Sequence, residues 1–162
     1  MADGEVRLEP LAESHREALR AACAEDPDIW DIYPMSWVGE HFDRAFGQCF
    51  GTPQHIAFAV FLGERLVGMT SYLSVDAPNA ALEIGRTYFA PSVRGTGFNR
   101  RVKRLMLDRA FASGFRRVEF RIDIRNERSM AAVAKLGATR EGTLRQNRIT
   151  WTGYVRDTAV YS

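Results

Sequence analysis

The clearest chemical signal in the sequence is a glycine-containing segment, Arg94-Gly95-Thr96-Gly97-Phe98-Asn99-Arg100. It follows a stretch with strand periodicity and opens a stretch with helical periodicity. Glycine allows a tight turn with bare backbone N–H groups, and a helix N-terminus adds the positive end of its dipole, so the segment suits a phosphate or a pyrophosphate. No Gly-Lys-Ser/Thr follows it, which argues against a Walker loop, and its mid-chain position argues against a dinucleotide-binding fold.

Charge is distributed unevenly along the 162 residues, although the formal net charge is only +2. Residues 1–50 contain eleven Asp or Glu and four Arg, whereas residues 94–128 contain eleven Arg or Lys and four acids. The near-neutral total therefore hides one acidic and one basic block. An anionic ligand is expected at the basic block, which includes the glycine segment.

The hydrophobic periodicity predicts the elements that hold this segment. Helices are expected over 12–24 and 37–50, from Phe98 to a cap at Gly114, and from Asn126 as N-cap through Lys135. On the third helix, Lys103 and its basic neighbours are expected mostly off the apolar face. Strands are expected over 6–10, 55–62, 65–73, 81–89, 117–124, 139–145 and 152–161.

This order of elements predicts one α+β domain over 1–162, with a central mixed, mostly antiparallel sheet of about seven strands and about four helices. The helix between strands 81–89 and 117–124 is a right-handed crossover that joins parallel neighbours. A hydrophobic content of 46% suits one compact domain with a core. No apolar run approaches the roughly 20 residues of a membrane helix and no secretory signal is readable, so a cytoplasmic protein without a membrane partner is expected.

Cysteines and histidines offer little chemistry. Cys23 and Cys49 lack CxxC spacing and clustered histidines, so both are expected to be packing residues, and no metal site is expected. His15, His41 and His55 are expected to be surface or structural residues.

The glycine segment resembles the pyrophosphate loop of the GCN5-related N-acetyltransferases (GNAT), in which a basic or Gln residue precedes Gly-x-Gly/Ala. Downstream, Asn126-Glu127-Arg128-Ser129 and Lys135-Leu136-Gly137-Ala138 are similar to the Asn-x-x-Ser and Lys-x-Gly-Phe signature of that family. Upstream, Leu82-Glu83-Ile84-Gly85 looks like the Glu-Ile-Gly opening of its fourth strand. Two positions depart from the pattern, because Asn99 replaces a second small residue and Ala138 replaces an aromatic one.

The end of the chain resembles one subgroup. Arg140-Glu141-Gly142-Thr143-Leu144-Arg145 and Arg156-Asp157-Thr158 are similar to the end of the RimJ/RimL type, which acts on ribosomal-protein N-termini. Taken together, the resemblance covers nearly the whole chain. It implies the GNAT fold and acetyl transfer from acetyl-coenzyme A (acetyl-CoA) to a primary amine, by direct attack in one ternary complex. The acceptor would be a protein N-terminal amine or a small amine.

The resemblance also implies roles for single residues. Glu83 is the expected base for the amine, directly or through water, with Glu119 and Asp123 as rivals. The Ser129 hydroxyl would meet the leaving thiolate, and a backbone N–H at Tyr88 or Phe89 would stabilise the carbonyl oxygen.

The expected cofactor contacts follow the same resemblance. Asn126 would bind the pantetheine arm, and Lys135 or Arg100 the adenosine phosphate. The pyrophosphate would be held by Arg94 and by the loop amides of Gly95, Thr96, Gly97, Phe98 and Asn99.

An aromatic segment lies where the family has its variable acceptor wall. Trp30, Tyr33 and Trp37, with Met35, are expected either to line the substrate site or to belong to the core. The acidic first 50 residues would flank that side and attract a cationic amine.

Two other interpretations stay open. The chain could be a non-catalytic acyl-CoA-binding module on the same fold, or a nucleic-acid-binding module that uses its arginines, although no aromatic stacking pattern supports nucleic acid. A homodimer through an exposed last strand is a further alternative.

Overall fold

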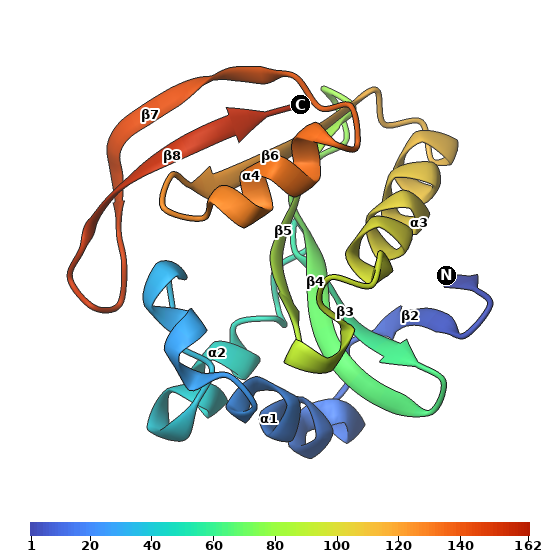
Figure 1. Cartoon of the computed structure of the whole chain (residues 1–162). Coiled ribbons are helices and arrows are strands. Elements are labelled where there is room, and N and C mark those ends of the chain that lie inside the picture. The colour runs from blue at the N-terminus through green and yellow to red at the C-terminus, as the bar shows by residue number, and fades with distance from the viewer.

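The computed structural model describes residues 1–162 and contains one mixed sheet of eight strands, in the order β1-β2-β3-β4-β5-β6-β8-β7 (Figure 1). All neighbouring strands are antiparallel except β5 and β6. The strands are β1 (Ala2–Asp3), β2 (Val6–Pro10), β3 (Ile56–Leu62), β4 (Arg65–Asp76), β5 (Ala81–Phe89), β6 (Arg117–Asp123), β7 (Arg140–Ile149) and β8 (Val155–Tyr161).

Four α-helices and four short 3-10 helices accompany the sheet. The α-helices are α1 (Arg16–Ala24), α2 (Phe42–Gly47), α3 (Phe98–Ala112) and α4 (Glu127–Ala134). The 3-10 helices are η1 (Glu13–His15), η2 (Pro27–Ile32), η3 (Gly39–His41) and η4 (Pro91–Val93). Figure 1 shows α1 and α2 on one side of the central strands and α3 on the other side.

The sheet separates two apolar cores because successive strand residues face opposite sides. On β3, Ala59 and Phe61 pack with α1, α2 and η2, whereas Val60 packs with α3. The first core also contains Trp30 and Trp37, both fully buried. The central strands are therefore buried on both faces, and packing from both sides holds them in place.

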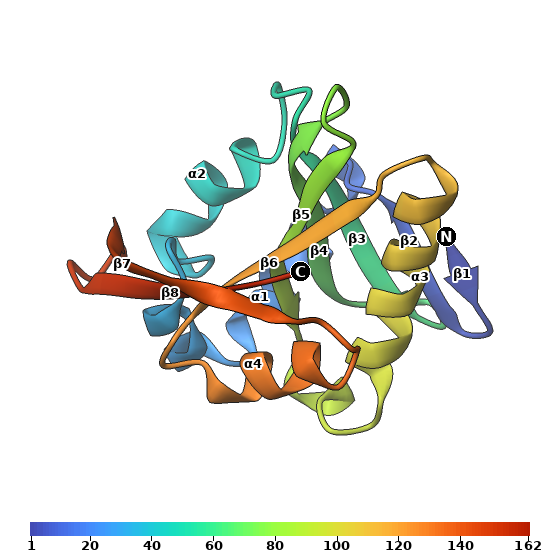
Figure 2. The same ribbon diagram turned by 90° about the horizontal axis from the view of Figure 1, so that it is seen from above.

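The parallel pair β5 and β6 is hydrogen-bonded only at its start, where Ala81–Glu83 faces Arg117–Glu119. Beyond Glu83 the two strands diverge, and Figure 2 shows β6 crossing away from β5. The crossover helix α3 begins at Phe98, directly after its N-cap Gly97, which has a left-handed φ of 83°. Asn126 begins α4 by accepting a hydrogen bond from the Ser129 amide at 3.0 Å, as an N-cap does.

The predicted fold is confirmed, with three differences of detail. The sheet has eight strands because Ala2–Asp3 adds a two-residue edge strand. The second helix is shorter than 37–50, because Val38 is extended and Gly39 has a positive φ of 56°. The last strand is not an edge strand, since β8 lies between β6 and β7. No helix combines the length and apolar character needed to cross a membrane.

Candidate active site

A cleft of about 710 Å³ occupies the region where β5 and β6 diverge. This volume is in the range of ligand sites. One half is lined by the residue 93–100 loop, the start of α3 and the start of α4. The other half is lined by the end of η2, the middle of β5 and β6, and the β7–β8 hairpin.

The glycine loop presents unpaired amides to the first half. Gly95 and Gly97 have left-handed φ angles of 78° and 83°, and nothing lies within 4 Å of a Cβ built on either. None of the backbone N–H groups from Gly95 to Arg100 donates a hydrogen bond within the chain. A cradle of free amides at the N-terminus of a 15-residue helix fits a pyrophosphate.

Three predicted loop residues differ in what their side chains do. The Phe98 ring is buried against Phe89, with ring centroids 5.2 Å apart, and so fixes the start of α3. The Thr96 hydroxyl donates to the Val93 carbonyl at 2.8 Å. The side chains of Phe98 and Thr96 do not line the cleft, whereas Asn99 does.

Arg94 is more constrained than expected. Its Nε donates to the Phe89 carbonyl at 2.7 Å, and its Nη1 is paired with Asp26. The Nη2 atom is buried without a partner. The guanidinium therefore ties the loop to the segment before η2 and keeps one donor group for another acceptor.

The start of α4 faces the same half of the cleft. Asn126 and Ser129 both line it, and neither the Asn126 side-chain NH₂ group nor the Ser129 hydroxyl makes a hydrogen bond within the chain. Arg100 and Lys135 lie at its border with exposed side chains and no ion pair. The structure thus brings together most of the predicted cofactor residues.

The middle of β5 is irregular. Arg86 and Thr87 stand opposite the single residue Thr70 of β4, and Arg86 has a left-handed φ of 47°. The bulge lies at the cleft, which Arg86, Thr87 and Phe89 line. The Tyr33 hydroxyl donates to the Thr87 carbonyl at 2.7 Å and anchors the bulge.

Glu83 lies at the point where β5 and β6 separate. Its carboxylate, 15% exposed, faces the cleft without a hydrogen bond and lies 3.8 Å from the Arg121 guanidinium. A Cβ on Gly85 would approach Glu83 Oε1 to 2.7 Å, so the absence of a side chain there makes room for the carboxylate. Burial raises the pKa of Glu83, and nearby Arg121, Arg148 and Arg156 oppose that rise.

The two rival carboxylates are already engaged. Glu119 accepts hydrogen bonds from Arg117 at 3.0 Å and Arg121 at 3.1 Å, and it does not line the cleft. Asp123 is buried and bound by Arg125 at 2.7 Å; burial alone would raise its pKa, but those hydrogen bonds hold it below the usual value. Glu83 is therefore the least engaged of the three.

Lys103 contradicts the prediction that it lies off the apolar face. Its side chain is 5% exposed, and Nζ lies 2.5 Å from Thr87 Oγ1 and 3.4 Å from Thr70 Oγ1, beneath the β5 bulge. Burial lowers its pKa to about 7, although Glu83 opposes the shift. The signal was present, because Lys103 is three and seven residues before the buried Met106 and Ala110.

The aromatic segment divides between cleft and core. Tyr33 and Trp37 line the cleft, whereas Trp30 does not. The Trp30 indole stacks on Tyr88 at 4.7 Å between centroids and donates to the Cys23 carbonyl at 3.2 Å. The Tyr88 side chain also points away from the cleft, with its hydroxyl donating to the Ala22 carbonyl at 2.7 Å. Of the three predicted wall residues, Trp30 and Trp37 are thus both core residues, and Trp37 also borders the cleft.

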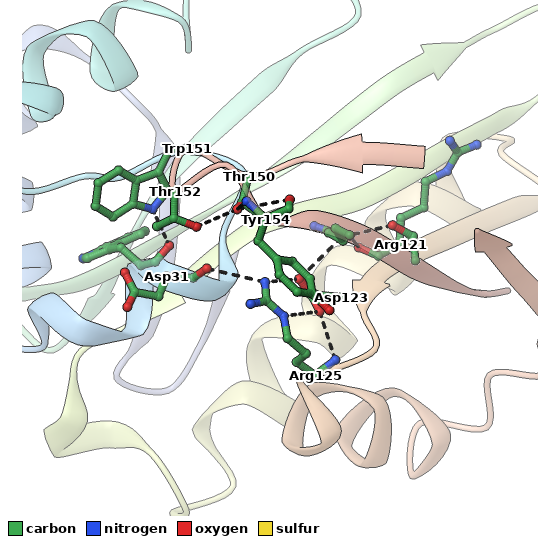
Figure 3. A network of polar contacts seen from close by, with 11 residues as sticks. Asp31, Arg121, Asp123, Arg125, Thr150, Trp151, Thr152 and Tyr154 are labelled. Atoms are coloured by element: carbon green, nitrogen blue, oxygen red, sulfur yellow. Dashed lines mark hydrogen bonds and ion pairs between the residues drawn. The ribbon is translucent and has the colours of Figure 1, made fainter. Parts of the chain in front are cut away.

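The turn between β7 and β8, residues 150–154, contacts η2 and Arg125 (Figure 3). Trp151 Nε1 donates to the Trp30 carbonyl at 2.8 Å, and the Arg125 guanidinium lies 3.7 Å from the centre of the Tyr154 ring. Figure 3 shows Arg125 between Tyr154, Asp123 and Asp31. These contacts join the C-terminal hairpin to η2.

The expected acidic flank is absent. None of the eleven acids of residues 1–50 lines the cleft. Asp43 instead binds Arg16 and Arg20, and Asp26 binds Arg94. Contrary to the expectation, no acid of residues 1–50 therefore lines a path for a cationic amine. The histidines and cysteines also lie outside the cleft, and both cysteines are buried and free.

The forked sheet, the cleft in the fork and the free amides at the crossover helix together suit a phosphate-bearing ligand. Residues 5–139 match the model of the acetyltransferase (GNAT) domain family. The chain belongs to this family.

Solved structures agree with the assignment. A candidate acetyltransferase from T. thermophilus is 34% identical, with a TM-score of 0.86 and coverage of 97% of this chain and 84% of that chain. A probable GNAT-family acetyltransferase from Chromobacterium violaceum is 30% identical, with a TM-score of 0.91 and coverage of 99% and 83%. The microcin C7 self-immunity acetyltransferase MccE, solved with acetyl-CoA and AMP, shares the fold at 20% identity, a TM-score of 0.86 and coverage of 98% and 92%. No curated protein sequence matches the chain significantly.

Proposed function

We propose that the protein transfers an acetyl group from acetyl-CoA to a primary amine by direct attack in a ternary complex. One observation carries the proposal. A single cleft joins the free amides of Gly95–Arg100 to the partly buried carboxylate of Glu83, which accepts no hydrogen bond within the chain, beside the β5 bulge. Membership of the GNAT family and the acetyl-CoA complex of MccE support the choice of co-substrate.

Acetyl-CoA supplies the activated acyl group, and the first half of the cleft would hold it. The Gly95–Arg100 amides, with the free Nη2 of Arg94, would bind the pyrophosphate. The free side-chain NH₂ group of Asn126 would bind the pantetheine arm. The exposed cations of Arg100 and Lys135 would meet the adenosine phosphate.

The reacting groups belong to the centre of the cleft. The amine nitrogen forms a bond to the acyl carbon as the carbon–sulfur bond breaks, Glu83 takes the amine proton, and the Ser129 hydroxyl hydrogen-bonds the leaving thiolate. A raised pKa makes Glu83 a better proton acceptor at neutral pH than an ordinary carboxylate. A backbone N–H at Tyr88 or Phe89, next to the bulge, would stabilise the negative carbonyl oxygen.

Three further properties are predicted from the sequence alone. These are membership of the RimJ/RimL subgroup, a cytoplasmic location, and a homodimer. The edge available for a dimer is β7, since β8 is paired on both sides. A dimer that forms through β7 would cover its exposed residues Leu144 and Ile149.

The first experiment measures the melting temperature with and without acetyl-CoA. Saturating acetyl-CoA should raise it, and Gly97→Glu should abolish the shift by placing a carboxylate among the loop amides. Gly97→Ala is the matched control, because it carries the strain of a side chain at φ 83° without the charge. The absence of any shift for the unmodified protein would refute the proposal.

The second experiment measures thiol release with an amine acceptor over a range of pH. Glu83→Gln should lower kcat by about 10²–10⁴ and remove the acidic limb of the pH profile. Ser129→Ala should lower kcat with little change in KM. An unchanged rate and profile in either variant removes that residue from the mechanism. Glu119→Gln, outside the cleft, is the control for loss of a nearby carboxylate.

A further inference from the structure

Arginines dominate the second half of the cleft, where the acceptor amine would enter. The cations on its wall come from strands β5, β6, β7 and β8, and only two carboxylates accompany them. The cations are Arg86, Arg121, Arg148 and Arg156, and the carboxylates are Glu83 and Asp123.

One of these carboxylates is already neutralised from outside the cleft. Asp123 binds Arg125, which does not line the cleft, at 2.7 Å, and it lies 3.9 Å from Arg156. Arg121 is paired with Glu119, outside the cleft, at 3.1 Å, whereas Arg86 and Arg148 make no ion pair. A ligand in this half therefore meets an excess of positive charge.

Arg148 is the cation with the least compensation. It makes no ion pair and no hydrogen bond, and it stands directly opposite Arg156 in the β7–β8 ladder. Like charges at directly opposite positions destabilise an antiparallel pair. Two guanidinium groups facing one another beside a cleft are instead stabilised when an anion lies between them.

This half also has apolar lining residues. Ile29 and Ile32 of η2, with Met35 and Trp37, form the facing wall. The acceptor therefore has room for an apolar part between the Glu83 carboxylate and the arginines.

We propose that the acceptor is a primary amine that also carries an anionic group, a carboxylate or a phosphate, and that Arg148 binds this group. The proposal rests on the proposed acetyl transfer and names its substrate class. The nearby arginines would also lower the pKa of the bound amine. They would therefore favour its neutral form, which is the form that attacks. A polyamine such as spermidine would instead place its remaining ammonium groups against the arginines.

The test compares matched amines by thiol release from acetyl-CoA, with rates expressed per concentration of neutral amine. The carboxylate arm pairs phenylalanine and leucine with their amides. The phosphate arm pairs phosphoethanolamine with ethanolamine, and spermidine is the cationic reference. The anionic member of at least one pair should have a kcat/KM at least tenfold higher than its neutral partner, and the arm that shows it identifies the anion.

Two variants of Arg148 and one control variant test whether Arg148 causes the preference for an anionic amine. Arg148→Gln should lower kcat/KM for the preferred anionic amine roughly tenfold or more, mainly through KM, and leave its neutral partner nearly unchanged. Arg145→Gln is the matched control, because Arg145 is exposed on the same strand, outside the cleft and without an ion pair. Arg148→Lys should restore part of the preference.

The outcomes separate the two proposals. If neutral amines or spermidine are acetylated as fast as the anionic amines, acetyl transfer stands and the anionic acceptor is refuted. If Arg148→Gln and Arg145→Gln behave alike, Arg148 does not bind the anion and the proposal is likewise refuted. If no amine of the panel releases thiol although acetyl-CoA raises the melting temperature, the proposed acetyl transfer fails, and the anionic acceptor fails with it.

Discussion

The buried ammonium of Lys103 should lower the stability of the protein at neutral pH, and Lys103→Met should reveal by how much. In the unfolded chain the amine keeps its proton up to about pH 10.5, whereas burial lowers its pKa in the folded protein to about 7. Between these values the unfolded state binds more protons, so the free energy of unfolding rises with pH.

The magnitude follows from the difference between the two pKa values. A difference of about 3.5 pKa units at about 1.4 kcal/mol each gives a penalty of roughly 5 kcal/mol well below pH 7. Between pH 7 and pH 9 roughly 2 kcal/mol of that penalty disappears. For a chain of this length, this corresponds to a rise in melting temperature of about 4–8 °C.

Lys103→Met keeps the apolar stem and removes the charge. Thr70 and Thr87 stay hydrogen-bonded to each other at 2.8 Å, so no hydroxyl is orphaned. The variant should therefore be more stable than the unmodified protein at pH 7, and this advantage should shrink toward pH 9. Above pH 9 the buried thiols of Cys23 and Cys49, whose pKa values are raised by burial, begin to oppose folding, which sets the upper limit of the window.

The assay is urea unfolding at half-unit steps from pH 7 to pH 9. Lys135→Met is the control, because Lys135 is the other lysine of the chain and its side chain is exposed. Its stability should stay within about 0.5 kcal/mol of the unmodified protein at every pH. Parallel stability curves for the Lys103 variant and the unmodified protein would refute a buried, perturbed amine.

Three further substitutions test the packing around the cleft, each by urea unfolding. Asp123→Ala should cost about 3–5 kcal/mol, because it leaves the 5% exposed Arg156 without its carboxylate; a loss below about 1 kcal/mol would show that Arg156 is solvated. Trp30→Ala should also cost about 3–5 kcal/mol, since the indole is fully buried; a mild effect would place it on the cleft wall instead. Gly68→Ala should cost about 3 kcal/mol or more, because its Cβ would lie 2.1 Å from the Tyr88 carbonyl oxygen, while Gly142→Ala, which meets nothing within 4 Å, should have little effect.

The fold could be predicted because local patterns determine it. The alternation along Arg117–Asp123 and the helical period from Phe98 onward coincide with β6 and α3. The glycine loop and the Asn126 cap were also readable, since each depends on backbone conformation over a few adjacent residues. Most of the predicted cofactor half lies in these short segments, and the structure brings those segments to one cleft.

The acceptor half could not be predicted in the same way. Arg121, Arg148 and Arg156 come from β6, β7 and β8, and only the pairing of these strands brings them near Glu83. Lys103 was missed for a different reason. Hydrophobic periodicity counts a lysine as polar, although its long stem can be buried when hydroxyl groups meet the amine.

The charges that line the cleft differ from those expected from the sequence, in which an acidic block was expected to flank the acceptor side. None of the acids of residues 1–50 lines the cleft, and both halves of the cleft are lined by cations. Because added salt screens exposed charges, it should raise the KM of both acetyl-CoA and an anionic amine. A cationic amine, which the arginines repel, would show the opposite dependence, with a KM that falls as salt is added. The sign of the salt effect on the amine KM therefore shows whether the arginines attract the acceptor or repel it. A KM that rises with salt indicates attraction, and a KM that falls with salt indicates repulsion.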